Sequence, residues 1–224
     1  MKIKQFIQSI EEELISIRRH IHMYPELSKK EYKTQETIIK ILTKHHITYE
    51  KAATTGVVAT IKGKYPGKVV ALRADIDALP IQEKNDLPYK SQHQGIMHAC
   101  GHDAHTTILL GVAITLNKYK ETFNGTVKCL FQPNEEVSSG AKDLVKEGYL
   151  DDVDDIIGLH VMPYIETGEI EIKHGQLNAS SGAVIIEVFG KSSHGAYPET
   201  GIDAIMVSAS ILQNLQTIFT RNIS

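Results

Sequence analysis

The chain has 224 residues, of which 42% are hydrophobic and 23% are charged, and its formal net charge is −3. This balance is typical of a folded globular protein and excludes a disordered chain. The 24 Lys and Arg are spread among 27 Asp and Glu, so nucleic acid is not expected as a partner. No apolar stretch reaches the roughly 20 residues that a membrane-spanning helix needs, and the two cysteines make no disulfide framework. We therefore expect a cytoplasmic protein with no membrane partner.

Two helices are predicted at the N-terminus. Apolar residues recur at three- and four-residue steps from Ile3 to Ile21, which places them on one face of a helix that ends at Tyr24-Pro25. The segment from Ser28 to Glu31 has the spacing of a capping box, so a second helix is predicted from there to about His45.

Short β-type segments and a long loop are predicted next. Residues 56–61 and 69–72 read as strands, and the Lys64-Tyr65-Pro66-Gly67 turn between them predicts a hairpin. An irregular stretch then runs from Asp75 to about Asp103. A loop of that length inside a compact domain usually carries function.

Helices and apolar strands alternate through the following segment. Residues 106–119 predict a helix, 126–131 a strand, 141–147 a helix and 156–159 a buried strand. This alternation predicts an α/β fold in which helices and a sheet form layers.

The pattern changes near residue 182. Residues 183–189 predict a strand and 203–219 a helix, separated by a loop rich in Gly, Ser and His. We therefore expect one domain over residues 1–181 and the beginning of a second over 182–224. The second segment is too short to bury a core of its own, so that domain is expected to be incomplete.

Polar groups follow three of the predicted apolar strands. Arg73-Ala74-Asp75 follows the strand at 69–72, the segment Gln132–Glu136 follows the strand at 126–131, and His160 follows the strand at 156–159. In open α/β sheets the binding crevice lies outside the carboxyl ends of the strands. The three groups therefore predict one site.

A cysteine–histidine motif lies in the long loop, where four of the 11 histidines fall within 13 residues. In an extended chain Cys100 and His102 point the same way and can converge on one ion. A thiolate with an imidazole suits zinc, or manganese, cobalt or nickel at a site that also has carboxylates. His160 and a glutamate would complete such a site, which we favour over a merely buried Cys100. Structural or supporting roles are favoured for His98 and His105.

Glu135 and Glu136 are adjacent after a buried strand and Pro133. Neighbours on an irregular chain point to different sides, so one can bind metal while the other acts as a general base on water. A solvated pair at a helix start is the alternative, and the position directly after a buried strand argues against it.

Five motifs in matching order resemble the amidohydrolase branch of the di-metal exopeptidases. That branch includes N-acyl-amino-acid amidohydrolases, hippurate hydrolase, indoleacetyl-amino-acid hydrolases and N-acetyldiaminopimelate deacetylase. The motifs are Arg-Ala-Asp-Ile-Asp-Ala-Leu-Pro-Ile at 73–81, Met-His-Ala-Cys-Gly-His-Asp-Ala-His at 97–105, Gln-Pro-Asn-Glu-Glu at 132–136, Gly-Leu-His-Val at 158–161 and Gly-Lys-Ser-Ser-His-Gly-Ala-Tyr-Pro at 190–198.

The resemblance implies a function and a set of roles. The expected reaction is hydrolysis of N-acyl amino acids at a site with two divalent metals, manganese or zinc first and cobalt or nickel as alternatives. The expected architecture is a mixed-sheet catalytic domain with helices on both faces, followed by an inserted α+β dimerisation, or lid, domain. The implied metal ligands are Cys100, His102, Glu136 and His160. Glu135 matches the general acid/base, Asp75 an aspartate that orients ligands, and His194 a histidine donated across a homodimer.

The sequence departs from the resemblance in two ways. In the wider superfamily a metal-binding histidine stands two residues before the aspartate. This sequence has Arg73 at that position, and members of this branch have an arginine there too. Family members are also much longer, so we expect an N-terminal part of an enzyme with impaired activity. Two rival hypotheses stay open: a non-catalytic fragment that still binds metal, and a cysteine hydrolase that uses Cys100 with a histidine.

Overall fold

The computed structural model describes residues 3–137, 139–177 and 184–221 of the chain. It divides into two units, residues 1–170 and 171–224, and each is described by itself. The predicted boundary near residue 181 falls within 178–183, which lie outside the described residues.

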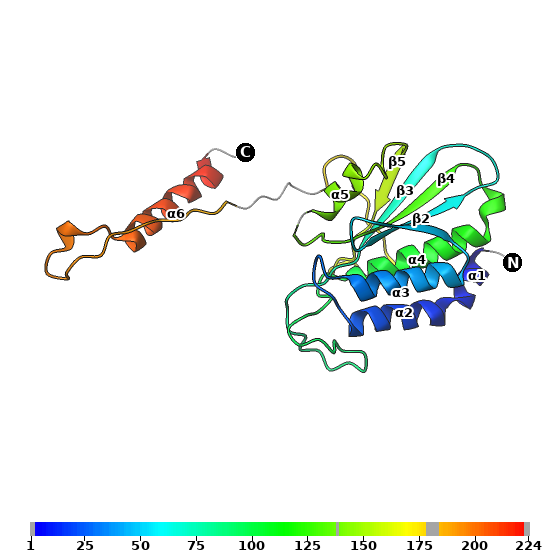
Figure 1. The fold of residues 1–224 in the computed structure, drawn as a ribbon, viewed down its shortest axis with the longest axis horizontal. Coiled ribbons are helices and arrows are strands. Elements are labelled where there is room, and N and C mark those ends of the chain that lie inside the picture. The colour runs from blue at the N-terminus through cyan, green and yellow to red at the C-terminus, as the bar shows by residue number, and fades with distance from the viewer. Residues whose placement is uncertain (1–2, 138, 178–183, 222–224) are drawn as a thin grey trace. The chain divides into compact units, whose positions relative to one another are not determined.

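The first unit is built on a five-stranded mixed sheet with the order β1-β2-β4-β3-β5 (Figure 1). The strands are β1 (Thr48–Ala52), β2 (Gly56–Lys62), β3 (Val69–Asp75), β4 (Thr126–Gln132) and β5 (Asp155–Gly158). β1, β2 and β4 pair antiparallel, whereas β3 runs parallel to both β4 and β5. The carboxyl ends of β3, β4 and β5 therefore meet at one edge of the sheet. The predicted mixed α/β fold is confirmed.

The predicted hairpin between residues 56–61 and 69–72 is wrong, because β4 lies between β2 and β3. The Lys64–Gly67 turn reverses the chain, but its backbone bonds go to the segment before β4, including Lys64 N–H to the Phe123 carbonyl. The hairpin is instead β1–β2. Its turn has left-handed backbone at Ala53 and Thr54, positions where glycine or asparagine usually signals such a turn.

Helices cover both faces of this sheet, as predicted (Figure 1). On one face lie α2 (Glu11–Met23), α3 (Tyr32–Lys44) and α4 (His102–Lys118), whose side chains share a core with Val57 and Phe131. On the other face α5 (Gly140–Lys146) packs Leu144 against Ala71 and Leu130.

The single N-terminal helix that the periodicity predicts is two helices. α1 (Ile3–Ser9) ends before Ile10, and α2 starts at Glu11. The Ser9 hydroxyl donates to the Phe6 carbonyl 2.6 Å away, a side-chain bond that competes with helix continuation. Three glutamates then open α2, where negative charge favours a helix start.

The predicted capping box at Ser28–Glu31 is also wrong. α3 begins at Tyr32, and its N-cap residue Glu31 makes no side-chain cap bond. The Thr34 N–H in the first turn donates instead to Glu26 Oε2, 2.8 Å away. The Ser28 hydroxyl donates to Asp77 Oδ2, 2.6 Å away, and Glu31 is fully buried. Both side chains therefore bond residues that are distant in the sequence rather than the N–H groups at the start of α3.

The predicted buried strand at 156–159 lies at the edge of the sheet, and the described residues pair it with β3 alone. All four residues of β5 are exposed, with Ile156 at 56% and Ile157 at 59%. A short apolar run does not distinguish a buried strand from an edge strand. Burial is therefore the part of this prediction that fails.

Residues 76–101, all described, form the predicted long loop between β3 and α4. The loop is fixed by a bridge between Leu79 and Met97 and by a bond from Gln92 N–H to the Met23 carbonyl. Buried His22 of α2 also lies between Glu83 of this loop and Asp103 of α4. The loop is long but strongly anchored.

The second unit contains α6 (Ala204–Arg221) and a short 3-10 turn, η2 (Pro198–Thr200). The helix predicted at 203–219 is confirmed, and Asp203 accepts hydrogen bonds from Ile205 N and Met206 N. The strand predicted at 183–189 is absent from residues 184–189, the described part of that range. Val184 and Ile185 are more than 85% exposed, and a strand needs a neighbour to pair with.

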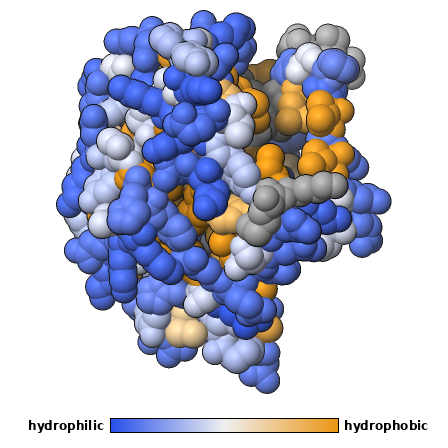
Figure 2. Space-filling model, turned by 90° about the vertical axis from the view of Figure 1, so that its right-hand side faces the viewer, coloured by the Kyte–Doolittle hydropathy of each residue, from blue (hydrophilic) through white to orange (hydrophobic). Residues whose placement is uncertain are grey.

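None of the described helices is long and apolar enough to cross a membrane. Hydrophilic residues predominate on the face drawn in Figure 2, with hydrophobic residues in smaller groups.

Candidate metal centre

Potential metal-binding side chains gather at the carboxyl edge of the three parallel strands. Asp75 is the last residue of β3, Glu135 and Glu136 follow β4, and His160 follows β5. His102 opens α4. The parallel pairing of β3 with β4 and β5 brings these distant segments together.

Cys100, His102 and His160 form one compact group of donors. Their ligand atoms all lie within 4.8 Å of one another, and Cys100 Sγ is 3.3 Å from His160 Nε2. His160 Nδ1 donates its hydrogen to the Val161 carbonyl, 2.7 Å away. That bond fixes the ring and leaves Nε2 facing the thiol.

His102, Glu135 and Glu136 form a second group within the same 4.8 Å limit. His102 Nε2 lies 3.7 Å from Glu136 Oε1 and 3.6 Å from Asp75 Oδ2. Glu136 Oε1 is buried and has no hydrogen-bond partner among the described residues. A buried carboxylate oxygen without a donor is costly, and a cation beside it would supply the missing partner. The four predicted ligands thus lie in one cluster around His102, and their donor set fits a divalent metal.

Asp77 also belongs to this cluster, although the sequence reasoning did not single it out. Its Oδ1 lies 3.3 Å from His102 Nδ1, and its Oδ2 accepts bonds from Ser28 Oγ (2.6 Å) and Glu136 N (3.0 Å). Burial opposes ionisation, but these contacts outweigh it and lower the pKa of Asp77 to about 2. The available signal was the Asp-x-Asp spacing, because Asp77 stands two residues after Asp75.

Asp75 is held mainly by His105 and Arg73. Val161 N donates to His105 Nε2 at 2.9 Å, so the ring hydrogen is on Nδ1, which donates to Asp75 Oδ1 at 2.6 Å. Both nitrogens of His105 are therefore occupied, which supports a structural role for it. Arg73 Nη1 contacts Asp75 Oδ2 at 2.7 Å, and its Nε donates to Gln132. Burial raises the pKa of Asp75, but these neighbours and the charge of His102 lower it overall.

The backbone around Cys100 is tightly constrained. Gly101 has a φ of +81°, and a Cβ there would lie 2.4 Å from Val161 Cγ2, so only glycine lets the two segments approach this closely. His98 is buried with neither ring nitrogen bonded among the described residues. Burial lowers the pKa of His98 to about 4, so it is neutral at pH 7.

The cluster carries more negative than positive charge. Burial and the carboxylates of Glu136 and Asp75 raise the pKa of Cys100 to about 11. Burial and the neighbouring Glu135 and Asp77 raise the pKa of Glu136, against the charge of His102. Burial lowers the pKa of His102, but Asp77 and Asp75 outweigh it and raise the pKa overall. A divalent cation would relieve these repulsions.

His194 belongs to the second unit. Its side chain is exposed, Nδ1 accepts a hydrogen bond from Ala196 N at 3.1 Å, and its ring lies beside Tyr197. Its role across a dimer stays a prediction.

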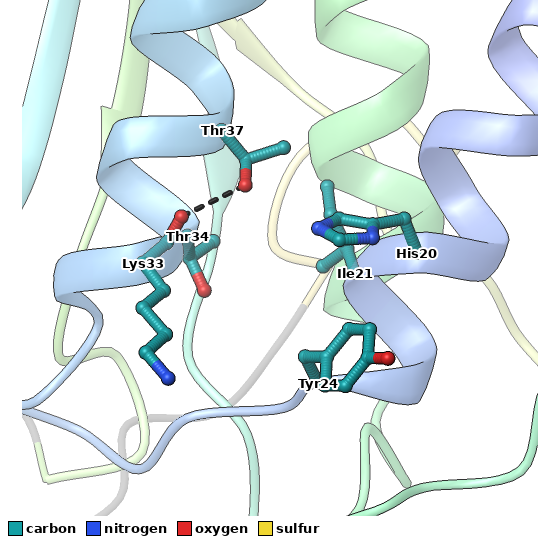
Figure 3. A pocket seen from close by; sticks show the side chains of 6 residues that line it. All are labelled: His20, Ile21, Tyr24, Lys33, Thr34 and Thr37. Carbon is teal, nitrogen blue, oxygen red and sulfur yellow. Dashed lines mark hydrogen bonds between the residues drawn. The ribbon is translucent and has the colours of Figure 1, made fainter.

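A hollow between α2 and α3 shares no residue with the cluster (Figure 3). Within it the Thr37 hydroxyl donates to the Lys33 carbonyl. Its lining residues are His20, Ile21, Tyr24, Lys33, Thr34 and Thr37.

Comparison with known proteins identifies the family. Residues 71–218 match the peptidase family M20/M25/M40. N-acetyl-L-cysteine deacetylase of Bacillus subtilis (strain 168) is 46% identical over 219 residues, which are 97% of this chain and 53% of that protein. N-acyl-L-amino acid amidohydrolase of Geobacillus stearothermophilus is 40% identical over 222 residues, or 98% of this chain and 60% of that protein. The chain belongs to the peptidase family M20/M25/M40, which confirms the resemblance drawn from the five motifs.

Solved structures agree with this assignment. A dinuclear metal-binding peptidase of the M20 family from Bacillus subtilis is 43% identical with a TM-score of 0.73, covering 75% of this chain and 48% of that one. A putative aminohydrolase from methicillin-resistant Staphylococcus aureus is 37% identical with a TM-score of 0.84, covering 98% and 59%. The chain spans 53% and 60% of the lengths of the two curated relatives above.

Proposed function

We propose that this chain carries the metal centre of an enzyme that hydrolyses N-acyl amino acids to a carboxylate and a free amino acid. The observation that carries the proposal is the pair of donor groups, Cys100/His102/His160 and His102/Glu135/Glu136, which share His102. Two relatives at 40–46% identity bear the names of an amidohydrolase and a deacetylase. Both names denote cleavage of an amide bond.

Cys100, His102, Glu136 and His160 would hold the metal, which we propose to be two divalent ions, manganese or zinc. When bound, such ions polarise an amide carbonyl and make water a better nucleophile near neutral pH. A solved relative named as dinuclear supports the number of ions.

Glu135 is the proposed general acid/base. It lies next to Glu136 and within reach of His102, so its carboxylate can accept a proton from water and later return it to the leaving amine. Asp77 and Asp75 would keep the imidazoles of His102 and His105 in their working orientations. We further propose a homodimer in which His194 of a second copy contacts the scissile carbonyl oxygen.

The alternative of a cysteine nucleophile is disfavoured by the surroundings of Cys100. Cysteine nucleophiles have lowered pKa values in electropositive settings. Here burial and the carboxylates of Glu136 and Asp75 raise the pKa of the thiol to about 11. A thiol in that setting suits a metal ligand, whose deprotonation the ion itself drives.

The test separates the roles of the two glutamates. In a version extended to the length of its relatives, Glu135→Gln is expected to retain bound metal and to lose hydrolysis of an N-acetyl amino acid panel by about 10²–10⁴-fold. Glu136→Gln is expected to lose metal as well, and the exposed Glu121→Gln serves as the control. Metal content is measured by elemental analysis beside turnover.

Two results would contradict this proposal. Full metal in both variants with turnover lost only in Glu136→Gln would reverse the roles. Bound metal without turnover, both in this chain and in a version extended to the length of its relatives, would favour a product that binds metal but is not catalytic.

A further inference from the structure

We propose that Glu31 and Asp77 are positioning residues that hold the Asn134–Glu136 turn by its backbone N–H groups. In doing so they set the directions in which the Glu135 and Glu136 side chains point. The consequence for catalysis rests on the proposed function, whereas the consequence for the turn does not.

The turn needs external support because its backbone is unusual. Asn134 directly follows Pro133 and has a left-handed backbone with a φ of +57°. The chain is also crowded there, since a Cβ on Gly140 would lie 1.7 Å from the Pro133 carbonyl oxygen. A non-glycine residue in this region persists only where its surroundings hold it.

Glu31 supplies the first support. Its Oε1 accepts a hydrogen bond from Asn134 N at 2.8 Å, and its Oε2 accepts one from Thr55 Oγ1 at 2.7 Å. The side chain is fully buried, and no ion pair among the described residues includes it. Burying a carboxylate without a cation is expensive, so bonds to N–H and O–H groups must compensate for it.

Asp77 supplies the second support and connects the turn to the metal cluster. One of its oxygens accepts from Glu136 N, while the other lies 3.3 Å from His102 Nδ1. Ser28 in turn donates to Asp77. The Ser-x-x-Glu pattern that resembles a capping box therefore serves this turn at both of its ends, through Ser28 and through Glu31.

The Asn134 N–H belongs to the Pro133–Asn134 peptide, and the Glu136 N–H belongs to the Glu135–Glu136 peptide. Holding both peptides restrains the short backbone segment between them, which carries Glu135. A catalytic group must be held within about 0.5 Å of its productive geometry, and a 1 Å error can cost about 10²-fold in rate. Loss of one support would let the turn rotate while leaving both glutamates in the protein. The expected defect is thus in kcat and, through Glu136, in metal affinity, with KM little changed.

The primary test is amide hydrogen exchange at residues 134–136. Glu31→Met removes the acceptor at similar size and is expected to speed exchange at Asn134 by at least about tenfold. Glu31→Gln keeps an acceptor oxygen and is expected to restore protection. Glu83→Met is the matched control, because Glu83 is also buried but bonds Ser91 N and His22 Nε2 rather than the 134–136 turn.

A milder variant keeps the test decisive if Glu31→Met does not fold. Ser28→Ala removes only a donor to Asp77 and is expected to speed exchange at Glu136 more than at Asn134. For catalysis, kcat of the metal-loaded Glu31→Met protein should fall by about 10–100-fold with KM within about threefold.

Unchanged exchange at 134–136 in Glu31→Met, or an equal rise there in Glu83→Met, would overturn the proposal. So would failure of Glu31→Gln to restore protection. Absence of turnover in a version extended to the length of the relatives would contradict the proposed function alone, because the exchange measurement needs no activity.

Discussion

The two sides of the candidate metal centre are built differently. On the β3–β4 side, His102 and Asp77 are each 1% exposed and each contacts several neighbours in the cluster. On the β5 side, His160 is exposed and follows a strand whose four residues are all exposed. His160 is fixed largely through Val161, whose N–H bonds His105. The buried side is therefore preorganised by the fold, whereas the exposed side depends on few contacts.

The largest effect should come from removing a donor on the buried side. We expect His102→Ala to weaken binding of Zn²⁺ or Mn²⁺ beyond the roughly 10–100-fold typical of residues that only support a ligand. It should also lower the free energy of unfolding by about 1–3 kcal/mol, because Asp77 loses its imidazole neighbour. Titration calorimetry and urea unfolding measure the two effects.

His160→Ala is the counterpart on the exposed side. It should weaken metal binding less than His102→Ala does. It should leave the free energy of unfolding within about 0.5 kcal/mol of the wild type, as most surface changes do. Equal losses in the two variants would show that the two sides do not differ in preorganisation.

Two glycine substitutions test how closely the loop at Gly101 must approach Val161 on the β5 side of the centre. Gly101→Ala and Gly95→Ala both place a side chain on left-handed backbone, at φ +81° and +73°, and each should cost about 1–2 kcal/mol of stability. Only Gly101 has Val161 within reach of the new Cβ. Urea unfolding and metal titration should therefore show weaker metal binding for Gly101→Ala alone. Weaker binding in Gly95→Ala as well would implicate the loop backbone instead.

The smallest expected effect is on the pH dependence of the free energy of unfolding. It concerns His22, which bonds Asp103 of α4 and Glu83 of the long loop. The hydrogen bond to Asp103 raises the pKa of His22, and the bond to Glu83 adds to this effect. Burial and the positive charge of Arg18 oppose it, and the pKa is raised overall. Because the folded pKa is raised, the stabilisation is complete below the unfolded value of about 6.5 and is lost as pH rises through the folded pKa. Urea unfolding of His22→Gln across this range should lack that loss.

The control for this measurement is His20→Gln, an exposed histidine on the same helix. It should keep the wild-type pH dependence. A His22→Gln protein with the same pH dependence as wild type would show that another group is responsible.

The general position of the candidate site could be predicted from the sequence. Asp75, Glu136 and His160 each follow an apolar strand, and parallel strands present their carboxyl ends at one edge. The Cys100–His102 spacing also indicated metal ligands, because a cysteine and a histidine two residues apart can bind one ion. These predictions depended on local order along the chain, which the sequence records directly.

The remaining features depend on contacts between distant segments. Glu31 stands in a pattern that also fits a capping box, and only the fold shows that its carboxylate reaches Asn134, 103 residues away. The exposure of Ile156 and Ile157 follows from the position of β5 in the sheet, which an apolar run cannot encode. The β1–β2 turn was missed because Ala53 and Thr54 give no turn signal.

The strand order has a consequence for biosynthesis. Cys100 and His102 precede His160 by about 60 residues, so at roughly 5–20 residues per second they leave the ribosome about 3–12 s earlier. During that interval the carboxylates that precede His160 also emerge, so the group that stays incomplete is Cys100/His102/His160. The proposed site at Cys100, His102 and His160 would therefore be completed only after β5 has emerged and joined β3, which would make capture of its ion a late step in maturation.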